Sequence, residues 1–549
     1  MMKGRLAEKI TDLTLELTSV RSIVGTAGEV DIANRVHQIF RKMKYFQQHP
    51  ENLHFVPVPH DPLGRKSVLA IVKGEKRQNK KAIVLIGHID TVGTSDYGLL
   101  ERYATKPLEL AEKFKEASLT DEVRTDLESG NYLFGRGIFD MKCGVSTLMA
   151  IIESVTEDIQ GFEGNLVFAA VCDEEGNSSG MLSVVPELIR LQAQEGFEYQ
   201  ALLDTDYSAP RFAGDTTKYV YIGTVGKLMP SFYVVGSEAH GGDPFKGLDS
   251  NHLSSAIMQE IDFNMKYSDE AEGEVTVPPI SLKQTDLKQE YSVQTPKTGY
   301  LYFNYGTHAS GPHQVLDKVM AGAKLAFQNL VDRLNEEHET YCKASGIPFH
   351  KLPWTARVLS YAELYDRVVA EKGVAAKEVL ETRKNELLAD PNVDERLFAL
   401  RMVETLHNLW SDNDPVVIAY FSPPYYPHVF VKGDSPLEKK LLRVVDELIQ
   451  QTYASHHVKM KRFYPYISDL SYASAPRDPS AIEALQANMP GFGTKYVLPL
   501  KEMQDLNLPV INIGPFGKDA HRYTERLEKQ YSFDIVPGLV RETIIKLLQ

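Results

Sequence analysis

The sequence predicts an α/β protein with a central, mostly parallel sheet flanked by helices, and with a smaller βαββαβ domain inserted into it. Three observations support this fold class. Short apolar runs without alternation recur along the chain, as expected of strands that are buried on both faces. Stretches whose apolar residues follow helical spacing lie between these runs. In the middle of the chain the pattern changes to one that suits a small, separate α/β layer.

Composition limits the classes of protein to which the chain can belong. With 549 residues, 43% of them hydrophobic and 24% charged, the chain is long and apolar enough to bury a sizeable core. Its 60 Lys and Arg face 74 Asp and Glu, for a net charge of −14. A nucleic-acid-binding protein needs a basic face, so nucleic acid is excluded as an expected partner.

The cysteines and the N-terminal segment indicate a cytoplasmic protein. Cys143, Cys172 and Cys342 are widely spaced and form no CxxC pair, so neither a disulfide framework nor a thiolate zinc site is expected. Cys143 and Cys172 flank polar motifs, but their apolar neighbours favour buried packing. The first residues show the spacing of an amphipathic helix between Leu6 and Val20 rather than an export signal. No stretch approaches about 18 uncharged apolar residues, so no membrane span is expected.

Four apolar runs are the predicted strands of the central sheet, and they are residues 82–86, 166–171, 201–203 and 510–513. The inserted domain is predicted from a strand over Lys227–Val235, a helix from Leu253, strands near Ile280 and over Tyr300–Tyr305, and a long helix from Pro312. It ends either at Thr355–Tyr361 or at Val416–Phe421. The predicted domains are 1–215 (first part of the catalytic domain), 216–423 (inserted domain with a helical extension) and 424–549 (second part).

Histidine and acidic residues follow every predicted core strand. In open parallel sheets, ligands bind beyond the carboxyl ends of the strands, so these residues are expected to lie close together. They are His88 and Asp90 after the first run, Glu174 and Glu175 after the second, Asp204 and Asp206 after the third, and His521 after the last. Asp140, between turn-forming glycines and a helix-like run, is a further candidate.

This combination of residues indicates a catalytic metal site. Several carboxylates at one place repel one another and raise each other's pKa unless cations hold them ionised. Imidazole and carboxylate ligands without thiolate suit catalytic Zn²⁺, or Mn²⁺ or Co²⁺. Asp90 is spaced to take the second ring N–H of His88. The adjacent Glu174 and Glu175 allow one to bind metal while the other accepts a proton from water.

The ordered set of motifs resembles the M20 metallopeptidases and aminoacylases. The motifs begin with LTSVRSIVGTAGE at 17–29, continue through GHIDTV, GRGIFDMKCG and CDEEGNSSG, enter the inserted domain with GTVGKL and GSEAHGGDPFKG, and close with ISDLSY and GPFGKDAHRYTE. Length and the stretch Leu202–Pro210 are most similar to the RocB-type arginine-utilisation branch. The resemblance implies a zinc-peptidase-like catalytic domain with an inserted lid domain, and hydrolysis of a peptide or N-acyl amide bond.

The resemblance also implies roles for individual residues and two divalent ions, foremost Zn²⁺. His88 and Asp206 would hold one ion, Glu175 and His521 would hold the other, and Asp140 would bridge them. Asp90 would orient His88, and Glu174 would be the general base. His240, from the lid, would stabilise the oxyanion, and the lid would provide the surface of a homodimer.

The lid strand departs from the family pattern in a way that bears on the substrate. Many members carry an Arg there to bind a substrate carboxylate, whereas this chain has Phe303-Asn304-Tyr305-Gly306. A carboxylate would then be held by Asn304, Tyr305 or Lys227. With the RocB-type resemblance, this favours an N-acylated basic amino acid, or a short peptide ending in one, as substrate.

Several alternatives stay open at the level of sequence. Asp204 is an alternative ligand to Asp206, and Asp469 in ISDLSY either supports the metals or caps a turn. Glu174 is alternatively a carboxylate at a helix N-terminus, and His240 a turn residue. The alternative function is a metal-binding, non-catalytic member of the fold. The Glu174-Glu175 pair argues against it, because a pure binding protein has no need of a general base.

Overall fold

The computed structural model describes residues 2–77 and 79–549. Within it the chain forms two compact units. The first unit comprises Met1–Thr224, Val429–Ala475 and Pro499–Gln549. The second unit comprises Val225–His428 together with Pro476–Leu498, a segment that sequence patterns had placed with the second part of the catalytic domain. The functional division into 1–215, 216–423 and 424–549 stays a prediction.

An eight-stranded mixed sheet forms the centre of the first unit, in the order β1-β2-β5-β3-β6-β17-β7-β16. Its strands are β1 (Leu53–Pro57), β2 (Lys66–Lys73), β3 (Lys81–His88), β5 (Asn165–Val171), β6 (Glu198–Asp204), β7 (Lys218–Ile222), β16 (Val458–Lys461) and β17 (Val510–Asn512). A separate small sheet joins β4 (Tyr132–Phe134), β18 (Gly517–Lys518) and β19 (Arg526–Glu528).

The four apolar runs of the sequence form one parallel block of this sheet. β5, β3, β6 and β17 are neighbours, and each pairs in parallel with the next. A fourth parallel pair joins β7 and β16, whereas three pairs are antiparallel, so the sheet is mixed. The predicted α/β class is confirmed. Because the four core strands run the same way, their carboxyl ends meet at one edge of the sheet.

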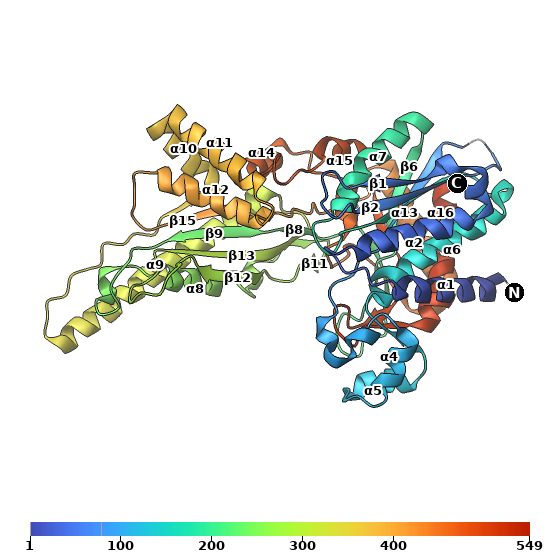
Figure 1. Ribbon diagram of the computed structural model, residues 1–549, viewed down its shortest axis with the longest axis horizontal. Helices are drawn as coiled ribbons and strands as arrows, with labels where there is room; N and C mark the ends of the chain where they lie inside the picture. The colour runs from blue at the N-terminus through green and yellow to red at the C-terminus, as the bar shows by residue number, and fades with distance from the viewer. Residues whose placement is uncertain (1, 78) are drawn as a thin grey trace. The chain divides into compact units, whose positions relative to one another are not determined.

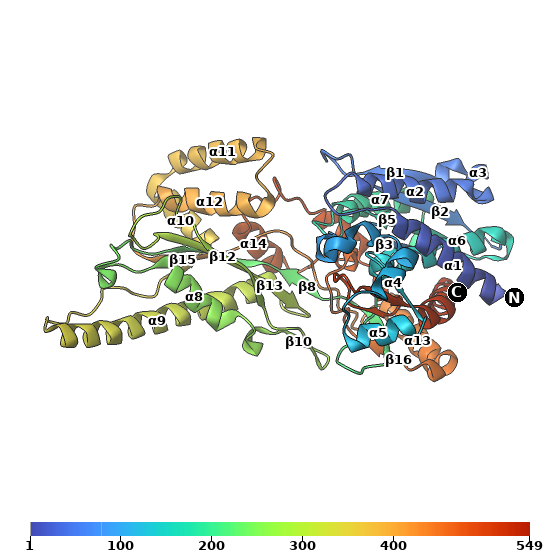
Figure 2. The ribbon, with the colours of Figure 1, turned by 60° about the horizontal axis from the view of Figure 1, so that its bottom comes forward.

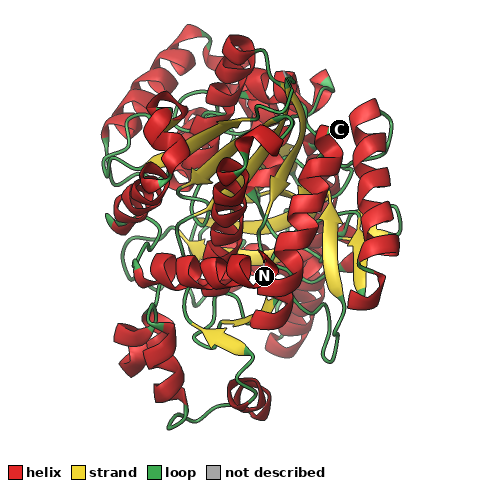
Figure 3. Ribbon diagram, turned by 90° about the vertical axis from the view of Figure 1, so that its right-hand side faces the viewer, coloured by secondary structure: helices red, strands yellow, loops and turns green. Residues whose placement is uncertain are grey.

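Helices surround the strands of the first unit, as Figure 3 shows. They are α1 (Met2–Ser19), α2 (Gly28–Lys42), α3 (Lys44–Gln48), α4 (Pro107–Phe114), α5 (Asp121–Glu128), α6 (Cys143–Glu157), α7 (Ser179–Glu195), α13 (Pro436–Glu447), α15 (Leu500–Leu506) and α16 (Val536–Leu548). The predicted N-terminal helix is α1, which packs on α6. Among the described helices, none combines the length and apolar character needed to cross a membrane.

The second unit has its own sheet, in the order β12-β13-β9-β15-β14, with β8 paired to β13. Its strands are β8 (Gly226–Leu228), β9 (Pro230–Val235), β12 (Ile280–Asp286), β13 (Thr298–Thr307), β14 (Val358–Ser360) and β15 (Val416–Phe421), with a short hairpin of β10 (Glu270–Ala271) and β11 (Glu274–Val275) beside them. The single predicted strand over Lys227–Val235 divides at Met229, before Pro230, which has no N–H to donate. Both candidate closing strands, β14 and β15, belong to this sheet and pair in parallel.

Helices cover both faces of the second sheet (Figures 1 and 2). α8 (Ser250–Ile261) and α9 (Pro312–Ser345) lie on one face, and α10 (Tyr361–Lys372), α11 (Val374–Ala389) and α12 (Glu395–Leu409) lie on the other. The long helix predicted from Pro312 is α9, and apolar residues at helical spacing along it are buried, including Val319 and Phe327. α14 (Pro479–Asn488) packs on α9, α10 and β15, which explains why 476–498 joins this unit.

Candidate metal centre

Several of the polar residues predicted to form the site lie at or just after the carboxyl ends of the core strands. His88 is the last residue of β3, Asp204 is the last residue of β6, and Glu174 and Glu175 follow β5. Two glycines allow other backbone to approach the turn after β6. A Cβ on Gly144 would lie 2.1 Å from the Thr205 carbonyl oxygen, and one on Gly514 would lie 1.7 Å from that of Asp206. Neither position has room for a side chain, so the sequence needs glycine at both.

One carboxylate, that of Asp140, lies between two imidazoles. Its Oδ1 is 3.0 Å from His88 Nε2, and its Oδ2 is 3.0 Å from His521 Nε2. His521 Nε2 is also 3.0 Å from Glu175 Oε1. His88, Asp140 and Glu175 each offer one ligand atom, and these atoms lie within 4.8 Å of one another. Each oxygen of Asp140 thus lies beside a different imidazole, which agrees with the predicted bridge, although that role stays a prediction.

Asp90 connects His88 to the two glutamates. Its carboxylate oxygens accept hydrogen bonds from the backbone N–H groups of Glu174, at 3.2 Å, and Glu175, at 3.0 Å. His88 Nδ1 is 3.2 Å from the backbone oxygen of Asp90 and 3.7 Å from its Oδ1. An N–H at Nδ1 directed at this carbonyl leaves Nε2 as the ligand atom. Asp90 thus contacts the His88 ring chiefly through its backbone carbonyl.

Asp204 and Asp206 differ in how their carboxylates are used. Both oxygens of Asp204 accept hydrogen bonds, one from Thr205 N at 2.8 Å and the other from Ser468 Oγ at 3.0 Å. Asp206 accepts one from Tyr207 N at 2.7 Å through Oδ1. The difference supports Asp206 as the ligand and Asp204 as a neighbour that is held in place, although the choice stays a prediction.

The electrostatics are those of a crowded, buried acidic cluster. Burial raises the pKa of the Glu174, Asp206 and Asp469 carboxyls well above the usual range, and neighbouring carboxylates raise it further. Burial also raises the pKa of Asp140, but the hydrogen bonds from His521 and His88 outweigh it and lower that pKa overall. Asp140, which contacts both imidazoles, is therefore strongly stabilised as an anion.

This donor set fits divalent cations. The described group offers imidazole nitrogens and carboxylate oxygens, and no thiolate. Without added positive charge, the buried carboxylates cannot all ionise at neutral pH, because each raises the pKa of the next. Ions bound among them would supply that charge. The residues present therefore suit catalytic rather than structural metal.

The turn that presents Glu174 is held by an arginine that sequence reasoning missed. Asp173 adopts a left-handed conformation with φ of 64°, which Asp tolerates better than most residues. Its carboxylate forms an ion pair with Arg65, which also contacts Glu29 and Asp61. Arg65 precedes β2 and is remote from any site motif in sequence, so no local pattern could have identified it.

Aromatic side chains lie beside Asp206. Tyr207 follows it in the chain, and its ring lies 4.9 Å from that of Tyr466 and 4.7 Å from that of Phe139, measured between centroids. Tyr466 is 38% exposed, whereas Tyr464, beside it, is fully buried. The charges of Asp206 and Asp140 add to burial in raising the pKa of Tyr466. One ring near the acidic cluster is therefore accessible to solvent.

The other predicted residues, His240, Lys227, Asn304 and Tyr305, belong to the second unit. His240 is exposed, and its Nδ1 accepts a hydrogen bond from Gly242 N at 3.0 Å. In that state Nδ1 carries no proton, so Nε2–H is the free donor. Asn304 and Tyr305 are consecutive in β13, so their side chains point to opposite faces of the sheet. Tyr305 is 1% exposed, and Lys227 Nζ lies 5.8 Å from the Tyr426 ring centroid.

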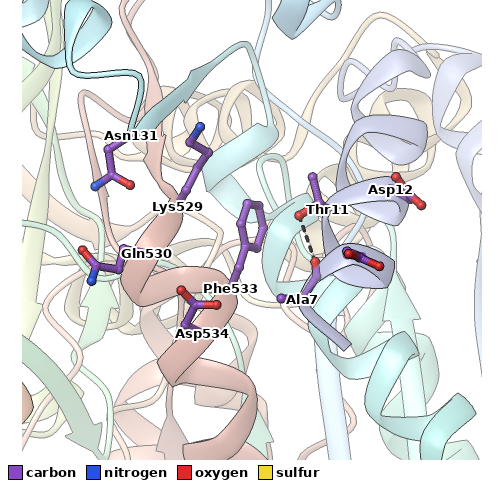
Figure 4. A pocket seen from close by; sticks show the side chains of 9 residues that line it. Ala7, Thr11, Asp12, Asn131, Lys529, Gln530, Phe533 and Asp534 are labelled. Atoms are coloured by element: carbon purple, nitrogen blue, oxygen red, sulfur yellow. Dashed lines mark hydrogen bonds between the residues drawn. The ribbon is translucent and has the colours of Figure 1, made fainter. Parts of the chain in front are cut away.

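A separate pocket in the first unit contains none of these residues. It has a volume of about 770 Å³ and lies between α1 and the short helical segment Gln530–Ile535 that precedes α16 (Figure 4). Its lining is mostly polar and includes Thr11, Asp12, Lys529 and Asp534 beside the ring of Phe533. It presents no histidine and no buried carboxylate cluster, so it is not the candidate metal centre.

Comparison with known proteins places the chain in a family. Residues 84–489 match the model of Peptidase family M20/M25/M40. Protein RocB of Bacillus subtilis is 33% identical over 99% of this chain and 95% of its own length. YqjN of the same organism is 34% identical over 100% of this chain and 98% of its own length.

Solved structures agree in fold. Aminopeptidase PepT from Bacillus cereus has a TM-score of 0.52 at 11% identity, covering 99% of both chains. The metallo-carboxypeptidase Sso-CP2 from Sulfolobus solfataricus also has a TM-score of 0.52, at 8% identity, covering 98% of this chain and 100% of its own. These likenesses show the fold alone. With the family match, they confirm the predicted resemblance: the chain belongs to Peptidase family M20/M25/M40 and is an M20-type metallohydrolase.

Proposed function

We propose that the chain hydrolyses a peptide or N-acyl amide bond with water, using two divalent ions and Glu174 as general base. The observation that carries this proposal is the Asp140 carboxylate between His88 and His521, with the Glu174-Glu175 pair anchored beside it by Asp90. Two ions, foremost Zn²⁺ with Mn²⁺ or Co²⁺ as alternatives, would activate the water and polarise the carbonyl when bound. His88 and Asp206 would hold one, Glu175 and His521 the other, and Asp140 both.

The remaining steps are carried out by the side chains of the protein. Glu174 takes the proton of the attacking water and delivers it to the leaving amine, so a single carboxylate serves both transfers. Burial and the adjacent carboxylates raise the pKa of Glu174, and bound ions would supply the positive charge that lets it ionise and accept the proton. Asp90 fixes the backbone of both glutamates, so that Glu175 is available as a ligand while Glu174 remains free for proton transfer.

His240 is the proposed donor to the oxyanion, from the same chain or from a second copy. Its Nδ1 is engaged by Gly242 N–H, which leaves Nε2–H to donate. Replacing His240 with Ala is expected to lower kcat by more than it raises KM, because the oxyanion forms only towards the transition state. Steady-state kinetics measure this split, and Asp243→Asn, at a neighbouring exposed position, is the control. An effect confined to KM would assign His240 to substrate binding.

The proposed homodimer would use the second unit. β12 is one of the two edge strands of that sheet, and no other described strand pairs with its outer side. An edge strand has unpaired N–H and C=O groups that can pair with another chain. This supports the predicted lid surface as the place where two copies associate.

For substrate, we propose an N-acylated basic amino acid or a short peptide ending in one, in arginine or ornithine catabolism. The 33% identity to RocB over 99% of this chain agrees with the RocB-type resemblance from which this class was predicted. The accessible Tyr466 ring near the acidic cluster supports it independently, because aromatic faces attract guanidinium and ammonium groups. Substrate carboxylate recognition by Lys227, Asn304 or Tyr305 stays a prediction.

A substrate panel tests both the activity and the class. N-acyl amino acids and dipeptides that differ only in side chain are compared by kcat/KM at constant ionic strength, with metal-replete protein. Arg, Lys and ornithine compounds are expected to exceed Glu and Leu compounds. Tyr466→Ala should narrow this preference by about 2- to 30-fold, the range of one cation–π contact of about 0.5–2 kcal/mol, whereas Tyr466→Phe keeps it. Preference for acidic or apolar compounds would exclude the basic class, and turnover of none would exclude the function.

A further inference from the structure

Arg136 is a buried arginine, and each nitrogen of its guanidinium donates a hydrogen bond. It is 1% exposed. Its Nε donates to the Gly93 carbonyl at 3.0 Å, its Nη1 donates to Glu525 Oε2 at 2.8 Å, and its Nη2 donates to both Asp96 oxygens, at 2.9 and 2.8 Å. Three chain segments therefore meet at one planar cation.

Each of these three segments carries residues of the candidate metal centre. Gly93 and Asp96 follow the stretch that contains His88 and Asp90. Arg136 itself lies four residues before Asp140. Glu525 lies four residues after His521. The segments are otherwise far apart in sequence, since Arg136 and Glu525 are separated by 389 positions.

Glu525 extends the connection to the backbone of Asp140. It is 0% exposed, and while Oε2 pairs with Arg136, Oε1 faces the N–H groups of Phe139, at 3.3 Å, and Asp140, at 3.4 Å. A second contact joins the same segments, because Gly135 N donates to the Glu525 carbonyl at 3.1 Å. One carboxylate thus holds the main chain at Asp140 and, through its own segment, the position of His521.

We infer that Arg136 and Glu525 are positioning residues that bring Asp140, His521 and the His88 segment into register for metal binding. The inference rests on the proposed function only in taking these three residues as ligands. Both side chains are buried, and Glu525 contacts the proposed ligand Asp140 through its backbone N–H. Disrupting the Arg136–Glu525 pair is therefore expected to lower metal affinity directly, and to lower catalysis only because less metal is bound.

The chemistry of the pair explains why these two residue types are needed. A guanidinium presents its N–H groups in a rigid planar fork, which satisfies a carbonyl and two carboxylates at once. A lysine ammonium keeps the charge but is a single point on a flexible stem. Partners that orient metal ligands typically contribute 10- to 100-fold to metal affinity.

The test compares Arg136→Lys and Glu525→Gln with the wild type. Arg136→Lys keeps the buried charge and removes the fork, and Glu525→Gln keeps the shape and removes the anion. Arg357→Lys is the matched control, because Arg357 forms a two-pronged pair with Asp412 and lies 5.3 Å from the Trp410 ring, but in the second unit. For each protein, Zn²⁺ or Mn²⁺ affinity and stoichiometry are measured by competition with a chromophoric chelator, and the unfolding temperature is measured with and without metal.

We expect both first-unit variants to bind metal about 10- to 100-fold more weakly and to lose much of the metal-induced rise in unfolding temperature. Arg357→Lys should keep the wild-type metal affinity and the wild-type rise in unfolding temperature on metal binding. A merely structural role would lower the unfolding temperature of the metal-free variants and leave metal affinity unchanged, which would overturn the inference. If one variant does not fold, the other decides by the same criterion. Absence of metal binding by the wild type would instead reject the proposed function, and the inference with it.

Discussion

Replacing Glu174 with Gln is expected to lower kcat by about 10²- to 10⁴-fold while metal content and fold are retained. This range is what a positioned acid–base group typically contributes. Gln has nearly the same shape, and Asp90 contacts the backbone of Glu174 rather than its side chain, so the substitution leaves the anchor of the Glu174-Glu175 turn intact. Only the capacity to accept a proton is lost.

The measurement pairs turnover of the best amide substrate with metal analysis of the same sample. Glu187→Gln is the matched control, because Glu187 lies in α7 of the same unit and pairs with His54 and Arg190, away from every proposed ligand. It is expected to keep wild-type turnover. If Glu174→Gln turned over at the wild-type rate with full metal content, the general base would have to be another residue.

The parallel block of the sheet was predictable because its signal is local. Each core strand contains a short, mainly apolar run, and burial on both faces favours that composition. Since β5, β3, β6 and β17 are neighbours, the polar residues after them share an edge, as expected. His88 lies at this edge because it is the last residue of β3, whereas Asp140 and His521 reach it from segments outside the parallel block, and their roles as ligands stay a prediction.

The sequence did not predict which atoms of a residue make a contact, or which contacts join segments that are distant in sequence. The two-residue spacing of His88 and Asp90 indicates that they are close, but it does not show that the Asp90 carboxylate holds the Glu174-Glu175 backbone instead. Hydrophobic periodicity gives no information about the contacts of Arg65 and Glu525, because their partners are remote in sequence. Likewise, the placement of 476–498 depends on the packing of α14 on the second unit.

Exhaustive chelation is expected to abolish turnover, and Asp140→Asn is expected to remove the metal pair. Anomalous scattering from the metal-replete wild type should find two ions about 3.5 Å apart, the usual separation in two-metal hydrolases, with Asp140 between them. Asn keeps the size of Asp but offers one neutral acceptor oxygen and no second anionic one, so it cannot bridge. Loss of the bridge should weaken the binding of both ions. His521→Ala should instead weaken the binding of the ion proposed for Glu175 and His521 more than that of the other ion.

Metal stoichiometry and turnover after adding back Zn²⁺, Mn²⁺ or Co²⁺ distinguish the outcomes of this prediction. Recovery with one of these ions, and not with Mg²⁺, would agree with the imidazole and carboxylate donor set. A single isolated ion with Asp140 uninvolved would contradict the bridge while leaving a one-metal hydrolase. Full turnover after complete chelation would contradict the mechanism itself. Two bound ions without turnover of any amide would favour the non-catalytic alternative, so the experiment separates the site from the reaction proposed for it.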